Sequence, residues 1–307
     1  MTARDNPLPP AVSGERRDLP SSSGRLSYYV SGPTSTAHAP LLLVHSVNAA
    51  ASAYEVRPLY EHYRTHRSVY ALELPGFGFS DRSEREYTPR LMTDAIDAMV
   101  GEIARLHGSA PIDALALSLS CEFLARAASE QPAPYRSLAL VSPTGFSGAA
   151  PKNGPPGSTR GMPWLRGFFT FPLWSRPFFD LLTSRRSIRF FLEKTWGSKT
   201  IDEGLAEYDW RTARQSGAHH APYYFVSGFL FSNDISRVYQ SLALPVFMVH
   251  GVRGDFVDYR QKQGFEAKPN WTIRVSPTGA LPHFEMLEAF TRDYDKFLAE
   301  AGGSRSG

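Results

Sequence analysis

The sequence predicts an α/β fold, in which a mostly parallel sheet is flanked by helices and the chain is interrupted by a helical insertion. Short apolar runs alternate with stretches of helical periodicity, which is the pattern of repeated βαβ units. The alternation stops near residue 146 and resumes near residue 241. The 307 residues, 42% of them hydrophobic, can bury a core without disulfides or a structural metal.

The first half of the chain supplies most of the predicted strands and helices. Residues 24–32 alternate weakly between apolar and polar side chains and predict an edge hairpin strand. Within residues 89–107, apolar residues recur at every fourth position, which places them on one face of a predicted helix. A second helix is predicted from residue 121. Continuous apolar runs, typical of strands buried on both faces, lie at residues 40–46, 69–76, 112–117 and 137–145.

Residues 146–240 differ in composition from the rest of the chain. They hold 11 of the 20 Phe and four of the five Trp, carry many Arg and show no clear strand, so we expect a helical cap. The expected organisation is a disordered arm rich in Pro and Ser at 1–23, a core domain at 24–145 and 241–301, and a tail at 302–307. The second part of the core is expected to contain strands at 245–251 and 272–279 and a helix at 283–301.

Charge and cysteine content exclude several classes of protein. The 33 basic and 30 acidic residues give a net charge of +3 and are scattered, whereas a nucleic-acid-binding protein needs a concentrated basic face. No apolar run reaches the roughly 18 residues that cross a bilayer, and the N-terminus has no apolar signal region. Cys121 is the single cysteine, and no Cys and His cluster has zinc-ligand spacing. We expect a soluble, cytoplasmic monomer or homodimer that needs no cofactor and no metal.

The stretch ALALSLSC, residues 114–121, carries the strongest chemical signal. A strand that ends in small-x-Ser-x-small and passes straight into a helix is the layout of a nucleophile elbow, whose close approach of strand and helix needs small neighbours. Ala116 and Ser120 take those positions around Ser118. Centring the motif on Ser120 would instead put Glu122 at a position for a small residue. Ser118 is therefore the predicted nucleophile, although a serine at such a junction is often only a helix cap.

At these residues the chain resembles the α/β-hydrolase superfamily, in its capped branch, over roughly residues 24 to 300. His45-Ser46 stands where that family usually has His-Gly, and LELPGFGFSDRS (72–83) is similar to the loop after the family's next strand. The resemblance implies a triad in the order Ser, acid, His. It also implies an oxyanion hole formed by the backbone N–H groups of Val47 and Leu119.

The resemblance assigns the acid and the base less simply. The acid belongs in the turn VRGDFVD, where Asp255 is the first candidate and Asp258 the second. The family's histidine usually follows a Gly after the last strand, but here Gly279 is followed by Ala280. His283 is the only histidine after Asp255, so it is the residue that can complete the triad in family order. A shift of about one helical turn, about 5 Å, is needed to bring it to Ser118.

The expected function is hydrolysis of an ester through an acyl-Ser118 intermediate, with His283 as base and Asp255 orienting it. The aromatic cap implies a substrate with an apolar acyl or aromatic group, and peripheral membrane contact through the cap is a further expectation. The alternatives are a carbon–carbon bond or thioester hydrolase with the same triad, and a hydrolase scaffold that binds a small apolar ligand without turnover. The unusual Ser46, Ser120 and Ala280 motivate the binding alternative.

Overall fold

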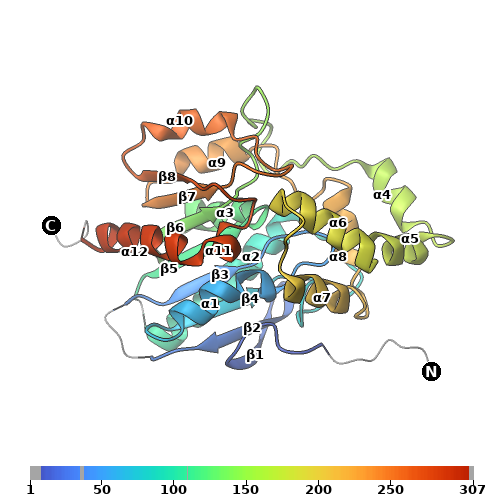
Figure 1. The fold of residues 1–307 in the computed structure, drawn as a ribbon, viewed down its shortest axis with the longest axis horizontal. Helices are drawn as coiled ribbons and strands as arrows, with labels where there is room; N and C mark the ends of the chain where they lie inside the picture. Colours follow the sequence, from blue (N-terminus) through green and yellow to red (C-terminus); the bar gives the residue numbers. More distant parts are fainter. Residues whose placement is uncertain (1–7, 35–37, 109, 304–307) are drawn as a thin grey trace.

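The computed structural model describes residues 8–34, 38–108 and 110–303, and its centre is one eight-stranded sheet (Figure 1). The strands are β1 (Glu15–Ser21), β2 (Gly24–Ser31), β3 (Leu41–Val44), β4 (Val69–Glu73), β5 (Ile112–Leu117), β6 (Tyr135–Val141), β7 (Val246–His250) and β8 (Trp271–Val275). Their order in the sheet is β1-β2-β4-β3-β5-β6-β7-β8. From β4 to β8 all neighbours are parallel, while β2 runs antiparallel to β1 and β4.

Both faces of strands β3 to β7 are buried, which explains their continuous apolar sequences. Leu41, Leu43, Leu115 and Leu117 pack on one face with helices α1 (Arg57–Tyr63) and α12 (Leu287–Gly303). The alternate residues face the other side, where α2 (Pro89–His107), α3 (Ser120–Glu130) and α9 (Ile235–Ser241) cover them. The predicted fold class is confirmed, and the helix predicted at 89–107 has those bounds.

The N-terminal arm corrects the prediction. Residues 15–21, expected within a disordered arm at 1–23, form β1, which pairs with β2 along its whole length. Leu8, Ala11 and Val12 are buried beside α1. The four consecutive charged side chains at the start of β1 hide the strand in the sequence, because an edge strand needs little apolar surface. Strand β2 is therefore an inner strand of the sheet instead of its edge, and residues 1–7 lie outside the described part of the chain.

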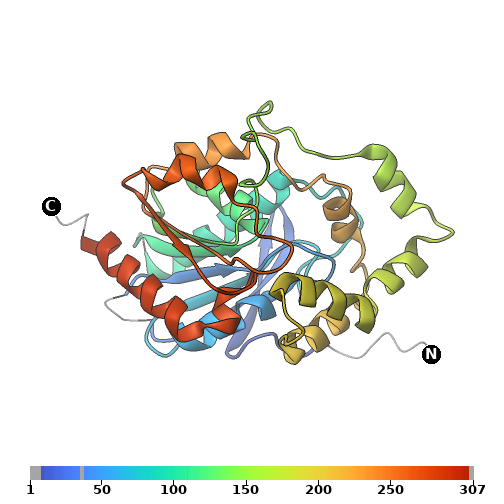
Figure 2. The same ribbon diagram turned by 45° about the horizontal axis from the view of Figure 1, so that its top comes forward.

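The segment between β6 and β7 is helical, as expected. Its helices are α4 (Pro163–Thr170), α5 (Ser175–Leu182), α6 (Arg185–Trp196), α7 (Glu203–Thr212), α8 (His220–Val226) and α9. Helix α9 packs against α3, so the segment rejoins the sheet layer before β7 begins. We call α4 to α8 the insertion. Figure 2 shows the insertion beside the sheet, with α4 and α5 on its outer side.

Short helices complete the structure near the carboxyl ends of the strands. They are η1 (Ala53–Val56), η2 (Arg260–Lys262), α10 (Gln263–Glu266) and α11 (Pro282–Glu285). The last helix, predicted from 283 to 301, is divided at Met286 into α11 and α12. Among the described residues, no helix combines the length and apolar character that crossing a membrane requires.

Candidate functional site

Ser118 stands in a strained turn between β5 and α3. Its φ is 51°, in the left-handed region where a residue with a Cβ pays about 1–2 kcal/mol. The turn is fixed on both sides, because the Ser118 N–H donates to the Val141 carbonyl (2.8 Å) and the Ser118 carbonyl accepts from Cys121 N–H (3.2 Å). Ala116 and Ser120, the small neighbours of the motif, are fully buried. The sequence thus forms a tight strand-to-helix turn with a serine at its apex.

Ser118 lines a cavity of about 380 Å³ between the carboxyl ends of the strands and the insertion. This is the edge at which open α/β sheets usually bind ligands. Part of the wall comes from the core strands and part from α6, α7 and the segment after α8. Its apolar wall residues are Val47, Leu192, Leu205, Phe225, Phe231, Phe256 and Leu281. Such a wall suits an apolar ligand with a few polar contacts.

The turn after β3 brings Val47 into the same cavity. His45 holds this turn, because its Nδ1 lies 2.5 Å from the Ser46 carbonyl and its Nε2 accepts from the Leu74 N–H (3.0 Å). Burial lowers the pKa of His45 to about 4, so the ring is neutral and serves as both donor and acceptor. Leu119 directly precedes α3, where a helix leaves its first N–H groups without intrahelical partners. Val47 thus lines the same cavity as Ser118, and Leu119 is the residue that follows Ser118 in the chain.

A polar network in the cavity wall was missed from the sequence. The carboxylate of Glu55 accepts from Ser46 N–H (2.7 Å), Ser46 Oγ (3.0 Å) and Asn48 Nδ2 (2.7 Å). Burial raises the pKa of Glu55 to about 6 in spite of these donors. All three residues line the cavity. Ser46 and Asn48 had a signal in the sequence, namely their position directly after a buried strand, whereas Glu55, in η1, had none.

Ser142, which follows β6, is a second strained serine that the sequence reasoning did not single out. Its φ is 48°, and it lines the cavity at the end of the strand next to β5. Its hydroxyl donates to the Ala280 carbonyl (2.7 Å), and the Ala280 N–H donates to the Thr195 carbonyl of α6 (2.8 Å). Ala280 is thereby held in the cavity wall between β6 and the insertion.

His283 lies elsewhere. Its ring is fully buried in α11 against Phe284 and Phe290, and its Nε2 donates to the Glu55 carbonyl at 2.8 Å. Its Nδ1 has no hydrogen-bond partner, so no carboxylate orients the ring. Burial lowers its pKa to about 4. The ring is not part of the cavity wall, where Ala280 stands in its place.

Asp255 and Asp258 both line the cavity, but each is paired with a cation. The half-exposed carboxylate of Asp255 lies 3.0 Å from Lys194 Nζ. Asp258 pairs with Arg260 at 2.7 Å and accepts from Gly148 N–H at 3.0 Å, and these contacts hold its pKa well below the usual range. Neither carboxylate is hydrogen-bonded to His283. The structure therefore gathers Ser118, Val47 and both acids around one cavity and leaves His283 outside it.

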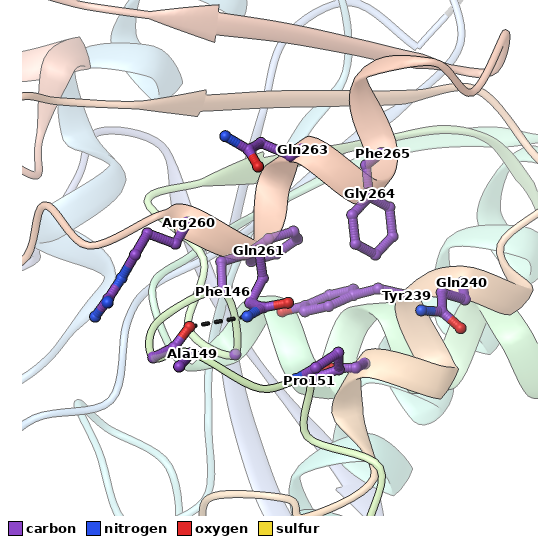
Figure 3. A pocket seen from close by; sticks show the side chains of 13 residues that line it. Phe146, Ala149, Pro151, Tyr239, Gln240, Arg260, Gln261, Gln263, Gly264 and Phe265 are labelled. Carbon is purple, nitrogen blue, oxygen red and sulfur yellow. Dashed lines mark hydrogen bonds between the residues drawn. The ribbon is translucent and has the colours of Figure 1, made fainter.

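A second hollow, of about 560 Å³, lies on the other side of the loop after β6. Figure 3 shows Phe146, Tyr239 and Phe265 at this hollow, and Gln261 Nε2 donates to the Gly148 carbonyl (2.8 Å). Neither Ser118 nor the acids of the loop after β7 line it, so it is not the candidate site. Within the described ranges, no three His, Cys, Asp or Glu side chains are arranged to hold a metal ion.

Comparisons with known proteins agree with this fold. Solved structures with a similar fold include a putative lipase from Acinetobacter baumannii (TM-score 0.70, 18% identity, covering 95% of this chain and 93% of that one). Others are a meta-cleavage product hydrolase from Pseudomonas fluorescens (0.68, 16%, 93% and 98%) and a carboxylesterase from Bacillus subtilis (0.66, 16%, 93% and 92%). No curated protein matches the chain. The model of the alpha/beta hydrolase family matches residues 41–293, which is most of the chain, and the protein is therefore a member of the alpha/beta hydrolase family.

Proposed function

We propose that this protein cleaves a small ester through an acyl-Ser118 intermediate. The observation that carries the proposal is the left-handed backbone of Ser118 at the wall of the cavity. Strained non-glycine residues persist where surrounding structure enforces them, and they cluster at functional sites. A carboxylesterase and a putative lipase share the fold at low identity. Related chemistries that attack a carbonyl carbon, such as thioester or carbon–carbon bond cleavage, would use the same serine.

The proposed first step is attack of Ser118 Oγ on the carbonyl carbon of the ester. The carbonyl oxygen becomes an oxyanion, for which the N–H groups of Val47 and Leu119 are the proposed donors. The tetrahedral intermediate then collapses, the alcohol leaves with a proton, and water later releases the acid from Ser118. The acyl group is expected to lie along the apolar wall near Leu192, Phe225 and Phe231.

The proton of Ser118 is the difficult part of this scheme. A serine hydroxyl is protonated at neutral pH and needs a neighbouring base. The proposed triad of Ser118, Asp255 and His283 requires two rearrangements. His283 must leave the Glu55 carbonyl and contact Ser118. Asp255 must leave Lys194 and contact His283. Such an exchange would have to carry a buried ring past Ala280 into the cavity.

The second candidate function is binding of an apolar carbonyl compound without turnover. The observation that favours it is Ala280 in the cavity wall together with His283 held by the Glu55 carbonyl. In this case the N–H groups of Val47 and Leu119 would bind a ground-state carbonyl oxygen. Ligand affinity would then be high, while the rate of cleavage would stay near that of water.

Labelling with a fluorophosphonate, followed by mass analysis of the Ser118 peptide, separates these functions. The ester hydrolase requires labelling of the parent protein and none in Ser118→Ala. Loss of labelling in His283→Ala would support the exchanged triad, whereas equal labelling in that variant would remove His283 as the base. A parent that stays unlabelled while it binds an apolar ester would favour the binding function.

A panel of p-nitrophenyl esters tests the substrate class. The apolar wall predicts that rates rise from acetate to butyrate and octanoate, because longer acyl chains bury more apolar surface at about 25 cal/mol per Å². Rates that peak at acetate would contradict an apolar acyl site.

A further inference from the structure

Helices α4 and α5 present large apolar side chains to solvent. Trp164 is 72% exposed, Leu173 78% and Leu181 70%, while Phe168 and Phe171 are about half exposed (51% and 47%). Contiguous apolar surface of this kind on a folded protein usually marks an interaction site. We call these five residues the apolar tip. Helices α4 and α5 lie on the outer side of the insertion, at the edge of the molecule (Figures 1 and 2).

The apolar tip is not an unfinished core. The same two helices have a buried side, on which Phe179 packs with Ala50, Ala213 and Tyr223, and Phe169 and Phe178 lie against this cluster. Trp164 and Phe168 instead lie four residues apart on α4, which places them on one outward stripe, and exposed Phe171 follows the helix directly. The helices therefore have a separate inner and outer apolar side.

The outer aromatic residues are held rigidly. Trp174 packs against Phe171 (ring centroids 4.4 Å apart) and Phe168 (5.4 Å), and its Nε1–H donates to the Phe168 carbonyl (2.8 Å). Their side chains would consequently lose little conformational freedom when they enter an apolar phase, which favours binding.

The segment that carries the apolar tip is rich in arginine. Residues 163–191 contain five arginines and one aspartate. Three of these arginines pair with acids, namely Arg176, Arg185 and Arg189. Exposed Arg186 makes no ion pair with any described residue, and Arg166 stacks on the Tyr224 ring (4.4 Å). Aromatic and leucine side chains beside arginines form the composition that binds the interface of a membrane with anionic lipids. A second copy of this chain would meet the apolar part but would set one arginine-rich segment against another.

We propose that α4 and α5 dock on an anionic phospholipid bilayer, with the apolar tip at the acyl boundary and the arginines at the headgroups. This surface is independent of chemistry at Ser118. Docking would place the insertion, and with it one wall of the cavity, next to the lipid phase.

Sedimentation of the full-length protein with phospholipid vesicles tests the proposal. The protein should bind vesicles of phosphatidylcholine with 30% phosphatidylglycerol. Its affinity for vesicles of pure phosphatidylcholine should be lower by about tenfold or more. The double variant Trp164→Ser, Leu173→Ser should lose at least tenfold in vesicle affinity. The variant Arg186→Glu should lose about fivefold to tenfold in vesicle affinity, and this loss should be smaller in 0.5 M salt, which screens the headgroup charge. Val275→Ser, which removes an exposed apolar residue on β8, should bind as the parent does.

Three results would overturn this proposal. One is a parent protein that does not bind the anionic vesicles. Another is equal binding by the parent and by the double variant, shown to be folded by its circular dichroism melting curve. The third is a dimer of the parent in light scattering that becomes a monomer in the double variant without any vesicle binding, since the apolar tip would then be a contact between copies.

Discussion

Ser118 and Ser142 have strained left-handed backbones, and for Ser118 the free energy of unfolding measures this strain. Glycine adopts a φ near 51° without a Cβ clash, so Ser118→Gly should raise the free energy of unfolding by up to about 1 kcal/mol. Ser118→Val should lower it by about 2 kcal/mol or more, because a β-branched side chain is worst in this region. Urea unfolding measures both. A Ser118→Gly variant less stable than the parent would show that the turn is not strained.

Ala280 permits a gain-of-function experiment. The variant Ala280→His places an imidazole in the cavity wall that Ser118 lines. If Ser118 lacks only a base, p-nitrophenyl ester hydrolysis should rise by about 10²-fold or more, because general-base catalysis typically contributes that much. Adding Ser118→Ala to this variant should abolish the gain. No gain in a folded Ala280→His protein would show that the missing imidazole is not the limiting feature.

At the scale of elements, His283 joins α11 to η1 through the Glu55 carbonyl. Its pKa is lowered from 6.5 to about 4, so its contribution to stability is present above pH 6.5 and is lost as the pH falls through 4. Such a shift corresponds to about 3 kcal/mol. His283→Gln keeps an N–H donor but does not titrate. The free energy of unfolding of the parent should therefore fall by about 3 kcal/mol more than that of the variant between pH 7.5 and pH 4.

Urea unfolding at several pH values checks this prediction. His45 carries a similar shift in both proteins and serves as an internal control, since its acid sensitivity should remain in the variant. If the free energy of unfolding depends on pH equally in the two proteins, His283 is not a buried, neutral ring in the folded protein.

The elements themselves could be predicted to different degrees. Strands such as β3 and β5 were evident because both of their faces are buried, and α2 was evident from its apolar stripe. Strand β1 was missed because its stability comes from backbone pairing with β2, which leaves no apolar pattern. The sequence predicts where an element meets a core, but it does not report backbone partners at the edge of a sheet.

The site shows the same division. Ser118 could be predicted because its small neighbours are local in the sequence. The direction of His283 could not, because its hydrogen-bond partner in Glu55 lies 228 residues away and is a main-chain oxygen. Glu55 itself has no local motif, and its role in the cavity wall depends on how the turn after β3 folds.

At the scale of the whole molecule, a buried charge cluster around Asp113 lies at the end of β5 opposite the cavity. Asp113, at the amino end of β5, lies between Arg67 (2.5 Å) and Arg136 Nε (2.8 Å) and accepts from Ser137 Oγ (2.6 Å). Arg67 and Asp113 are fully buried, so removing one partner leaves an uncompensated charge. Ser118 stands at the opposite, carboxyl end of the same strand.

Asp113→Ala should therefore lower the free energy of unfolding by about 3–5 kcal/mol. Fluorophosphonate labelling of Ser118 should keep the parent's rate at temperatures where the variant is still folded. Thermal melting and labelling on the same sample separate these effects. A stable variant with altered labelling would contradict the separation of the two ends of the strand.

We propose Ser118 as a nucleophile facing an ester site, and trapping of its acyl intermediate is the decisive test. The protein is mixed with p-nitrophenyl butyrate, quenched in acid and analysed by mass spectrometry. We expect one butyryl group per chain, located on the Ser118 peptide and absent from Ser118→Ala. A parent that binds the ester without any adduct, or an adduct at Ser46 or Ser142 instead, would contradict it.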